Sequence, residues 1–431
     1  MKTDIIYRHL RDSGFRLSID SRTVSGGEVF FALKGENFDG NSFAGDALDK
    51  GAEIAIIDDP LYQAPNTLIV DNVLEELQAV AIKHRDTLHI PVLAISGSNG
   101  KTTTKEILAR VLANDYKLHY TRGNLNNHIG VPLTILACPP DAGFMIVELG
   151  ANHVGEIAGL CSIARPDHGL ITNIGKAHLG EFGSLDDVVK AKSELYDYLE
   201  QENACVFYND ENELLKRLLA QRNVKKIPYS RPGDHSLTVK ELKHDPQLEV
   251  LAAIDGEDYI LKTNLFGLYN LENIIAACSV GLYFNVSPLI MQRALELYMP
   301  DNNRSQVYNT GKNTLICDSY NANPDSMSGV IASFRQYPGN NKTLILGDMF
   351  ELGKYETEEH EKILQELSGM EDINILLVGE VFHSLAHKYN MPSFKSREHL
   401  MKYLLDTPVR DSLILVKASR ALGLEKIYGL L

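Results

Sequence analysis

Short apolar runs alternate with helical repeats along most of the chain. Three runs, 92–95, 144–147 and 170–172, are apolar without alternation, which is typical of strands buried on both faces of a parallel sheet. Between the first two runs, residues 103–112 repeat their apolar side chains at helical spacing and predict a helix with one buried face. The middle of the chain is therefore expected to alternate strands and helices.

The same patterns predict elements on both sides of this region. The predicted strands are 29–33, 54–57, 314–317, 343–346, 373–378 and 413–416, and the predicted helices are 43–50 and 73–85. We expect the central β-α repeat to run from Pro91 to about Pro300, where the turn-rich segment 298–303 breaks it.

This order of elements predicts an α/β protein with three domains. A chain of 431 residues is too long for one ordinary core. We expect an α/β N-terminal domain over 1–85 and a central domain over 86–299, with a phosphate-loop type of mostly parallel sheet flanked by helices. Residues 300–431 are expected to form a Rossmann-like C-terminal domain.

The overall charge argues against a nucleic-acid-binding surface. The chain has 42 Lys and Arg against 57 Asp and Glu, a formal net charge of −15. Nucleic-acid affinity comes largely from Lys and Arg that replace phosphate counterions, so no nucleic-acid partner is expected. A small basic pocket for a nucleotide remains compatible with this charge.

The cysteines and the apolar segments indicate a cytoplasmic protein. The five cysteines are scattered without a CxxC pair, as expected for reduced thiols in the cytosol. The N-terminus lacks the apolar core of a signal peptide, and no window approaches the roughly 18 apolar residues of a membrane span. We therefore expect no membrane span, and we expect the protein to act as a monomer.

The strongest chemical signal is a phosphate loop that follows the strand 92–95. Its residues are Gly97, Ser98, Asn99, Gly100, Lys101, Thr102 and Thr103. The glycines allow backbone N–H groups to approach phosphates, and the N-terminus of the next helix adds partial positive charge. Lys101 is expected to reach the terminal phosphates and Thr102 to ligate Mg²⁺. The usual first glycine is replaced by Ile95, and the loop alone does not define the reaction.

Further polar residues follow the neighbouring strands. Glu148 ends the run 144–147, where an acid can hold Mg²⁺ or simply cap the strand. Asn152 and His153 come next, and His178 follows the third strand, at the edge where parallel sheets collect their ligands. From composition alone, Lys192 resembles a solvated helix lysine.

Taken in order, these motifs resemble those of the Mur ligase family over nearly the whole chain. The segments that carry the resemblance are 20–22, 27–35 and 38–40, which are similar to a UDP-sugar-binding domain, then 97–103, 123–127, 130–132, 148–153, 172–178 and 267–273. In the last of these, Gly267-Leu-Tyr269-Asn270-Leu-Glu-Asn273, Tyr269 stands where the family usually has His.

The C-terminal third resembles one branch of that family. Asp318-Ser-Tyr-Asn-Ala-Asn-Pro324 and Leu346-Gly-Asp-Met-Phe-Glu-Leu-Gly353 are similar to the signatures of the branch that adds D-alanyl-D-alanine to a UDP-N-acetylmuramoyl-tripeptide. Lys417-Ala-Ser-Arg420 resembles the family's KGSR, with Ala418 in place of Gly. Loop chemistry alone could explain one such segment, since Asn, Asp and Gly are common in turns. Three in order favour the family.

The resemblance implies an ATP-dependent ligase that makes the UDP-muramoyl-pentapeptide precursor of peptidoglycan through an acyl phosphate. It implies Lys101, His178 and Lys192 as catalytic residues, and Thr102, Glu148, His178 and Lys192 around two Mg²⁺ ions, the second bound through carbamylated Lys192. It implies nucleotide contacts from the loop and from Asn273, Arg304 and Asp318. It implies substrate contacts from Ser21, Arg22, Asn126, Asn127, Asn152, His153, Asn321, Asn323, Asp348, Lys417 and Ser419.

Three other interpretations stay open at this point. A ligase that forms the tripeptide and a folylpolyglutamate synthetase share the central domain, but the first has a different C-terminal motif and the second has no UDP-sugar domain. A phosphate-loop switch usually carries the full GxxxxGK[ST] and no third domain. The residues do not distinguish lysine from meso-diaminopimelate as the third residue of the acceptor peptide.

Overall fold

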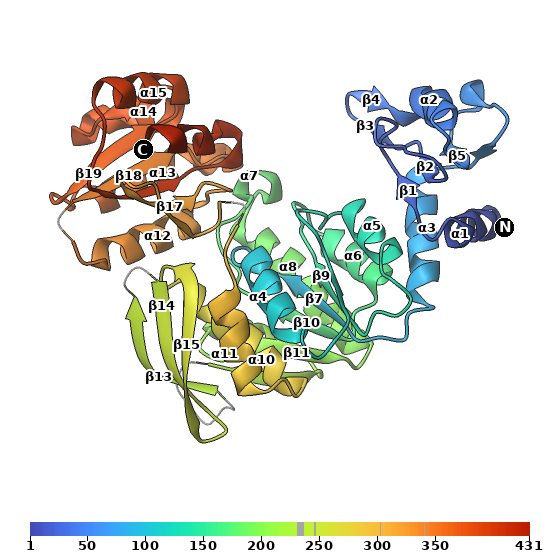
Figure 1. The fold of residues 1–431 in the computed structure, drawn as a ribbon, viewed down its shortest axis with the longest axis horizontal. Coiled ribbons are helices and arrows are strands. Elements are labelled where there is room, and N and C mark those ends of the chain that lie inside the picture. The colour runs from blue at the N-terminus through green and yellow to red at the C-terminus, as the bar shows by residue number, and fades with distance from the viewer. Residues whose placement is uncertain (231–236, 245–246, 302, 340) are drawn as a thin grey trace. The chain divides into compact units, whose positions relative to one another are not determined.

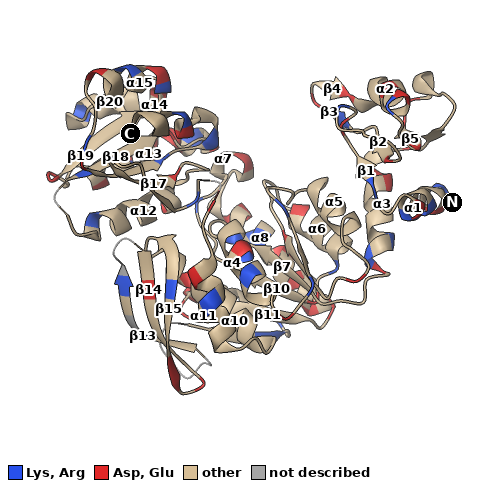
Figure 2. Ribbon diagram, in the orientation of Figure 1, with Lys and Arg blue, Asp and Glu red and all other residues tan. Residues whose placement is uncertain are grey.

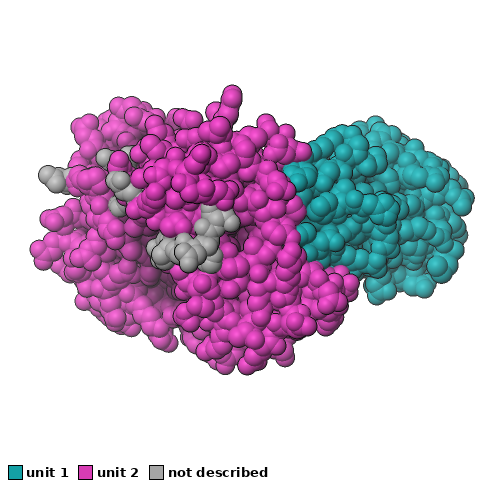
Figure 3. Space-filling view, turned by 90° about the horizontal axis from the view of Figure 1, so that it is seen from below, with its two compact units in different colours: residues 1–94, 116–150, 156–168 teal, residues 95–115, 151–155, 169–431 magenta. Residues whose placement is uncertain are grey.

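The computed structural model describes residues 1–230, 237–244, 247–301, 303–339 and 341–431. These residues form two compact units (Figure 3). Unit 1 comprises 1–94, 116–150 and 156–168, and unit 2 comprises 95–115, 151–155 and 169–431. The limits of these units differ from the domain limits expected from the sequence. Those domain limits, 1–85, 86–299 and 300–431, stay a prediction.

Unit 1 begins with a four-stranded parallel sheet in the order β1-β2-β5-β6. Its elements are α1 (Lys2–Asp12), β1 (Leu17–Ser18), β2 (Val29–Phe31), α2 (Ala44–Asp49), β5 (Ile54–Ile57), β6 (Thr67–Ile69) and α3 (Val73–Arg85), with a small hairpin of β3 (Lys34–Gly35) and β4 (Phe38–Asp39). Asn72 begins α3 by accepting hydrogen bonds from the backbone of Leu74 and Glu75. The two strands and two helices predicted in this region are confirmed.

The central strands are shared between the units, because the limit between them falls inside β7 (Val92–Ser96). Unit 1 holds the order β7-β9-β8, and unit 2 the order β12-β11-β10-β7. The strands are β8 (Leu118–Tyr120), β9 (Phe144–Glu148), β10 (His168–Ile171), β11 (Cys205–Asn209) and β12 (Lys225–Tyr229). The predicted apolar runs are thus buried strands of parallel sheet.

Helices accompany these strands in both units. Unit 1 has α5 (Gly130–Leu136) and α6 (Glu156–Ala164), and unit 2 has α4 (Lys101–Leu112), α7 (Leu179–Phe182), α8 (Leu185–Gln201), α9 (Glu213–Ala220), α10 (Asn270–Tyr283) and α11 (Pro288–Leu297). The predicted helix over 103–112 is confirmed and begins two residues earlier.

The β-α repeat expected up to residue 300 is wrong for residues 237–266. These residues form three antiparallel strands, β13 (Leu237–His244), β14 (Gln247–Ile254) and β15 (Glu257–Phe266), which stand beside α11 (Figure 1). Asp255 and Gly256 make the turn between β14 and β15 with positive φ angles. In β14 every second residue is buried, but apolar Leu251 and Ala253 at the half-exposed positions hide that alternation in the sequence.

The C-terminal part of unit 2 extends the same sheet to nine strands in the order β13-β14-β15-β16-β17-β21-β18-β19-β20. Its strands are β16 (Gln306–Asn309), β17 (Thr314–Asp318), β18 (Lys342–Gly347), β19 (Ile373–Val378), β20 (Ser393–Phe394) and β21 (Leu413–Lys417), and its helices are α12 (Pro324–Gln336), α13 (Glu356–Leu367), α14 (Glu380–Ala386) and α15 (Arg397–Asp406). The strands from β17 to β20 are parallel, and two apolar cores cover this part of the sheet. The four predicted C-terminal strands are confirmed. Residue 302 of the predicted break over 298–303 lies outside the described residues.

Residues of both charges are spread along the chain, and all five cysteines are free. Acidic and basic residues are interspersed along the ribbon in both units (Figure 2). All five cysteines are free, and four are buried, whereas Cys205 is half-buried. Within the described residues, none of the helices has the length and apolarity that crossing a membrane requires.

Candidate functional site

The phosphate loop connects the end of β7 to the start of α4, in unit 2. Gly97 and Gly100 have φ angles of 137° and 82°, which favour glycine. A side chain at Gly97 would collide with Thr172, and one at Gly100 with Asn273. The Lys101 ammonium lies over the loop, 2.7 Å from the carbonyl oxygen of Gly97. A helix N-terminus and a cation therefore lie in one place, as phosphate binding requires.

The segment after β10 holds this loop in shape. The backbone N–H of Ser98 donates to the carbonyl of Asn173 at 2.9 Å, and that of Asn99 donates to the Asn173 side chain at 2.9 Å. Thr172 Oγ1 donates to the carbonyl of Asn99 at 2.6 Å. The sequence pointed to both segments, and the structure brings them together.

Helix α10 supports the loop from another direction. Thr104 Oγ1 donates to Asn273 Oδ1 at 3.0 Å, and Asn273 Nδ2 donates to Asn270 Oδ1 at 2.9 Å. Asn270 Nδ2 reaches the carbonyl of Phe266 at 2.7 Å. Asn273, expected near the nucleotide, is buried and fixes the position of the loop helix.

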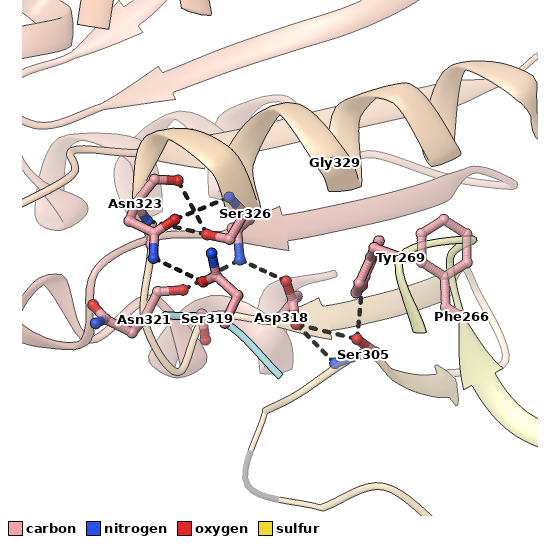
Figure 4. Close-up of polar contacts among 12 residues, drawn as sticks. Phe266, Tyr269, Ser305, Asp318, Ser319, Asn321, Asn323, Ser326 and Gly329 are labelled. Carbon is pink, nitrogen blue, oxygen red and sulfur yellow. Dashed lines mark hydrogen bonds and ion pairs between the residues drawn. The ribbon is translucent and has the colours of Figure 1, made fainter. Parts of the chain in front are cut away.

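A polar cluster beside α10 centres on Ser305, which the sequence did not single out (Figure 4). Its Oγ accepts from Asn270 Nδ2 at 3.1 Å and lies 2.7 Å from the Tyr269 hydroxyl. Its backbone N–H donates to Asp318 Oδ1 at 2.8 Å. Burial and the nearby charge of Asp318 raise the pKa of Tyr269 well above its ordinary value, so the phenol keeps its proton.

Asp318 joins this cluster to the last strand of the sheet. Lys417 Nζ lies 2.7 Å from Asp318 Oδ2 and 3.2 Å from the carbonyl of Asn321. The side chains of Lys417 and Asp318 are only 4% and 12% exposed. Both oxygens of Asp318 thus have partners within the protein, one on Ser305 and one on Lys417.

Arg304 and Asn323 lie next to the elements expected to meet the nucleotide. The Arg304 guanidinium stacks 3.6 Å from the ring centroid of Tyr320. Asn323 begins α12 with a capping box that also uses Ser326 (Figure 4). The Nδ2 of Asn323 donates to Asn99 Oδ1 at 2.8 Å. This contact joins the C-terminal part of the chain to the phosphate loop across 224 residues of sequence.

Asp348 and Ser419, expected at the substrate, are buried and hold other loops. Asp348 accepts hydrogen bonds from the backbone of Val381 and Phe382 at the start of α14, each at 2.9 Å. Burial raises the pKa of this carboxyl. Ser419 Oγ accepts from the backbone of Phe350 at 2.9 Å. Both side chains thus bond the backbone of neighbouring segments, Asp348 at the start of α14 and Ser419 at Phe350.

The expected metal ligands of unit 2 lie on three different elements. Thr102 is in the first turn of α4, and Lys192 on α8 is 2% exposed with its Nζ 3.5 Å from the carbonyl of Ala151. The interpretation of Lys192 as a solvated helix lysine is therefore wrong. His178, with φ of 55°, lies 2.8 Å from Glu351 Oε2, and this hydrogen bond lowers the pKa of Glu351.

The remaining predicted site residues lie in unit 1 and in the short segment 151–155 of unit 2. Glu148 is 2% exposed at the end of β9, and its Oε1 accepts from Asn126 Nδ2 at 2.9 Å. Asn127 accepts from the backbone of Gly130 at 2.9 Å and so helps to begin α5. Ser21 is buried, and Arg22 pairs with Asp20 at 2.7 Å. Asn152 is half-buried and His153 exposed.

Among the residues that the structure describes, no three His, Cys, Asp or Glu side chains are placed together to hold a metal ion. A Mg²⁺ site seldom needs such a cage, because the ion keeps waters and takes phosphate oxygens as ligands. Taken separately, the hydroxyl of Thr102 in unit 2 and the carboxylate of Glu148 in unit 1 are each a type of ligand that suits this ion.

The fold and the loop define a class of α/β enzymes that bind a nucleotide on a central parallel sheet. Family models match three successive parts of the chain: "Mur ligase family, catalytic domain" over 16–97, "Mur ligase middle domain" over 95–281, and "Mur ligase, glutamate ligase domain" over 303–420. The UDP-N-acetylmuramoyl-tripeptide--D-alanyl-D-alanine ligase of Bacillus subtilis is 30% identical over 95% of this chain and 92% of its own length.

Solved structures agree with these matches. A crystal structure of MurF from Acinetobacter baumannii has a TM-score of 0.87 and 27% identity, covering 98% of this chain and 97% of that one. MurF ligase from Thermotoga maritima in complex with ADP has a TM-score of 0.85 and 26% identity, covering 96% of both chains. The chain belongs to the Mur ligase family. It has the three-domain α/β fold of that family and is an ATP-dependent ligase, as expected from the sequence.

Proposed function

We propose that this enzyme joins D-alanyl-D-alanine to UDP-N-acetylmuramoyl-tripeptide and so makes the pentapeptide precursor of peptidoglycan. The main support is the match to a ligase of that name along 95% of this chain, which includes the C-terminal segments 318–324 and 346–353. Solved structures of two other amide ligases are less similar to this chain and support the fold alone. A UDP-N-acetylmuramoyl-L-alanyl-D-glutamate--2,6-diaminopimelate ligase is 15% identical, and a folylpolyglutamate synthase is 12% identical. Because the reaction uses ATP, we place it in the cytoplasm.

The chemistry requires activation, because joining a carboxylate to an amine in water is unfavourable. The terminal carboxylate of the tripeptide attacks the γ-phosphorus of ATP, the bond to the bridging oxygen breaks, and an acyl phosphate and ADP form. The amine of D-alanyl-D-alanine then attacks the acyl carbon, loses a proton and expels inorganic phosphate. The first step brings an anion to a polyanion, so fixed positive charge must surround the phosphates.

We assign that charge to the phosphate loop and its neighbours. Lys101 and the N–H groups at the start of α4 face the terminal phosphates. Arg304 approaches the nucleotide from its stack on Tyr320, a position that the buried Asp318–Lys417 pair and Ser305 maintain. Asn323, through Asn99, keeps the C-terminal part next to the loop while the acyl phosphate exists, which limits its hydrolysis by water.

We further propose that Thr102 and Glu148 hold one Mg²⁺ ion, and His178 and carbamylated Lys192 a second. The ions would neutralise charge on the phosphates. Carbamylation turns an ammonium into a carboxylate, and the low exposure of Lys192 would shield the carbamate from water. The sequence likeness to family motifs supports this set.

The substrates are assigned by region of the chain. Ser21 and Arg22 belong to the region that resembles a UDP-sugar-binding domain, and Asn126, Asn127, Asn152 and His153 to segments similar to the family's acceptor site. For the C-terminal residues Asn321, Asp348, Lys417 and Ser419, the contacts within the protein favour an indirect role, in which they shape the loops that receive the dipeptide.

One assay tests this proposal. The purified protein should form ADP from ATP only when UDP-N-acetylmuramoyl-tripeptide and D-alanyl-D-alanine are both present. Lys101→Ala should abolish that activity while its circular dichroism and melting temperature stay as in the wild type. ADP formation with UDP-muramoyl-dipeptide and a diamino acid, or with a folate and glutamate, would overturn the proposal in favour of another amide ligase.

A further inference from the structure

One short segment of unit 2, residues 172–178 after β10, touches both the phosphate loop and the C-terminal part of the chain. On the loop side, Asn173 accepts from the backbone of Ser98 and Asn99, as described above. Gly175 adds two contacts with the Ser98 hydroxyl. Ser98 Oγ donates to the carbonyl of Gly175 at 3.0 Å and accepts from the N–H of Gly175 at 2.9 Å. The segment is therefore bound firmly to the loop.

The next residue, Lys176, makes the contacts on the C-terminal side. Its backbone N–H donates to Asp325 Oδ2 at 2.7 Å, in the first turn of α12. Its ammonium donates to both carboxylate oxygens of Glu359 on α13, at 2.9 and 3.0 Å. Glu359 is buried, with 5% of its side chain exposed, whereas Lys176 is 35% exposed. One residue thus bonds two C-terminal helices at once.

The backbone around Lys176 is shaped for this close approach. A side chain at Gly175 would collide with the Asp325 carboxylate, and one at Gly180 would come within 2.7 Å of the Gly353 nitrogen. The Gly180 N–H donates to the carbonyl of Glu351 at 2.8 Å. In Figure 1, α7, which begins at Leu179, accordingly lies beside the C-terminal elements.

The carboxylate of Glu359 also has a partner on its own helix. Lys362 Nζ lies 2.8 Å from Glu359 Oε1, three residues along α13. Burial by itself would raise the pKa of Glu359, but the hydrogen bonds from Lys176 and Lys362 outweigh it and hold the pKa below its ordinary value. The two lysines differ in one respect: the contact of Lys176 crosses between elements 183 residues apart, and that of Lys362 stays within the helix.

We propose that Lys176 is a positioning residue for ligation. It fixes α12 and α13 in position relative to the phosphate loop. By holding Asp325 and Glu359, it keeps the start of α12, and so Asn323, against Asn99 of the loop. The inference rests on the proposed function, because it concerns the reaction in which the C-terminal part delivers the amine to the acyl phosphate. Lys176 lies inside the segment 172–178 that resembles the family, but the sequence gives no reason to single it out from its neighbours.

A double-mutant cycle with a matched control tests the proposal. Lys176→Met and Glu359→Gln should each lower kcat about tenfold, because small misplacements of reacting groups are costly, and the double variant should be no worse than either single one. Lys362→Met removes a partner of the same carboxylate without breaking the connection to the loop, so its kcat should stay within about twofold of wild type. Lys176→Arg should retain most of the activity.

Several results would overturn the assignment. These are a kcat of Lys176→Met within twofold of wild type, multiplicative losses in the double variant, or an equal loss in Lys362→Met. Thermal unfolding of each variant is measured alongside, and if Lys176→Met does not fold, Glu359→Gln against Lys362→Met decides the question. Wild-type protein that forms no ADP with the two proposed substrates would refute the proposed function instead, so the two failures are distinguishable.

Discussion

At the scale of single residues, the departure of this chain from its family at Tyr269 has a structural explanation. The Tyr269 hydroxyl lies within hydrogen-bond distance of Ser305 Oγ, which also accepts from Asn270, so the residue after Arg304 is fixed to the start of α10. Ser305 could not be recognised in the sequence, because its partners lie 35 and 36 residues earlier in the chain and 13 residues later. We therefore expect the tyrosine to help to place Arg304, the residue before Ser305.

Tyr269→Phe tests this role. The variant loses one hydrogen bond, worth about 1 kcal/mol, and leaves Ser305 bonded to Asn270 and Asp318. We expect KM for ATP to rise several-fold, with a smaller change in KM for D-alanyl-D-alanine. Tyr259→Phe is the control, because the Tyr259 hydroxyl donates to Glu257 at 2.9 Å within β15. An unchanged KM for ATP in Tyr269→Phe would contradict the role.

Lys192 allows a second test at this scale. If its carbamate holds a metal ion, Lys192→Ala should be nearly inactive and should recover in part when small carboxylates such as acetate or formate are added. The ligase assay with and without these anions measures the effect, and Lys190→Ala, an exposed lysine on the same helix, is the control. Full activity of Lys192→Ala without added carboxylate would remove the carbamate from the mechanism.

At the scale of elements, local pattern predicted the strands and helices well where periodicity was clear. The parallel strands that were predicted, and α3, agree with the structure within two or three residues, because doubly buried strands and a capped amphipathic helix leave strong local signals. Other parallel strands, such as β11 and β12, were not predicted. The antiparallel strands over 237–266 were missed, since apolar residues at half-exposed positions obscured their alternation. The candidate site was predicted as separate segments. The contacts that unite them, such as Asn323 with Asn99 and Lys176 with Glu359, are long-range and leave no local pattern.

At the scale of the whole molecule, a few charged and polar contacts join parts of unit 2 that lie far apart in the chain. Lys176 with Glu359, the Lys176 backbone with Asp325, and His178 with Glu351 all join the segment after β10 to the C-terminal part. Such contacts fix the relative position of the groups that they join. Their dependence on charge makes one of them accessible to a change of pH.

The pair of Lys176 and Glu359 should make the stability of unit 2 depend on pH in the acid range. The pKa of Glu359 is lower in the folded protein than its ordinary value near 4.5, so the folded state binds this proton less tightly than the unfolded state. Its contribution is therefore fully present above pH 4.5 and is lost as the pH falls through the lower, folded-state pKa. At pH 7, Glu359→Gln should melt several degrees below wild type, as expected for the loss of about 2 kcal/mol from hydrogen bonds to a charged group. Melting curves of both proteins between pH 7 and pH 3.5 should show this gap closing below pH 4.5, whereas a gap of constant size would mean that the charge of Glu359 does not stabilise the fold.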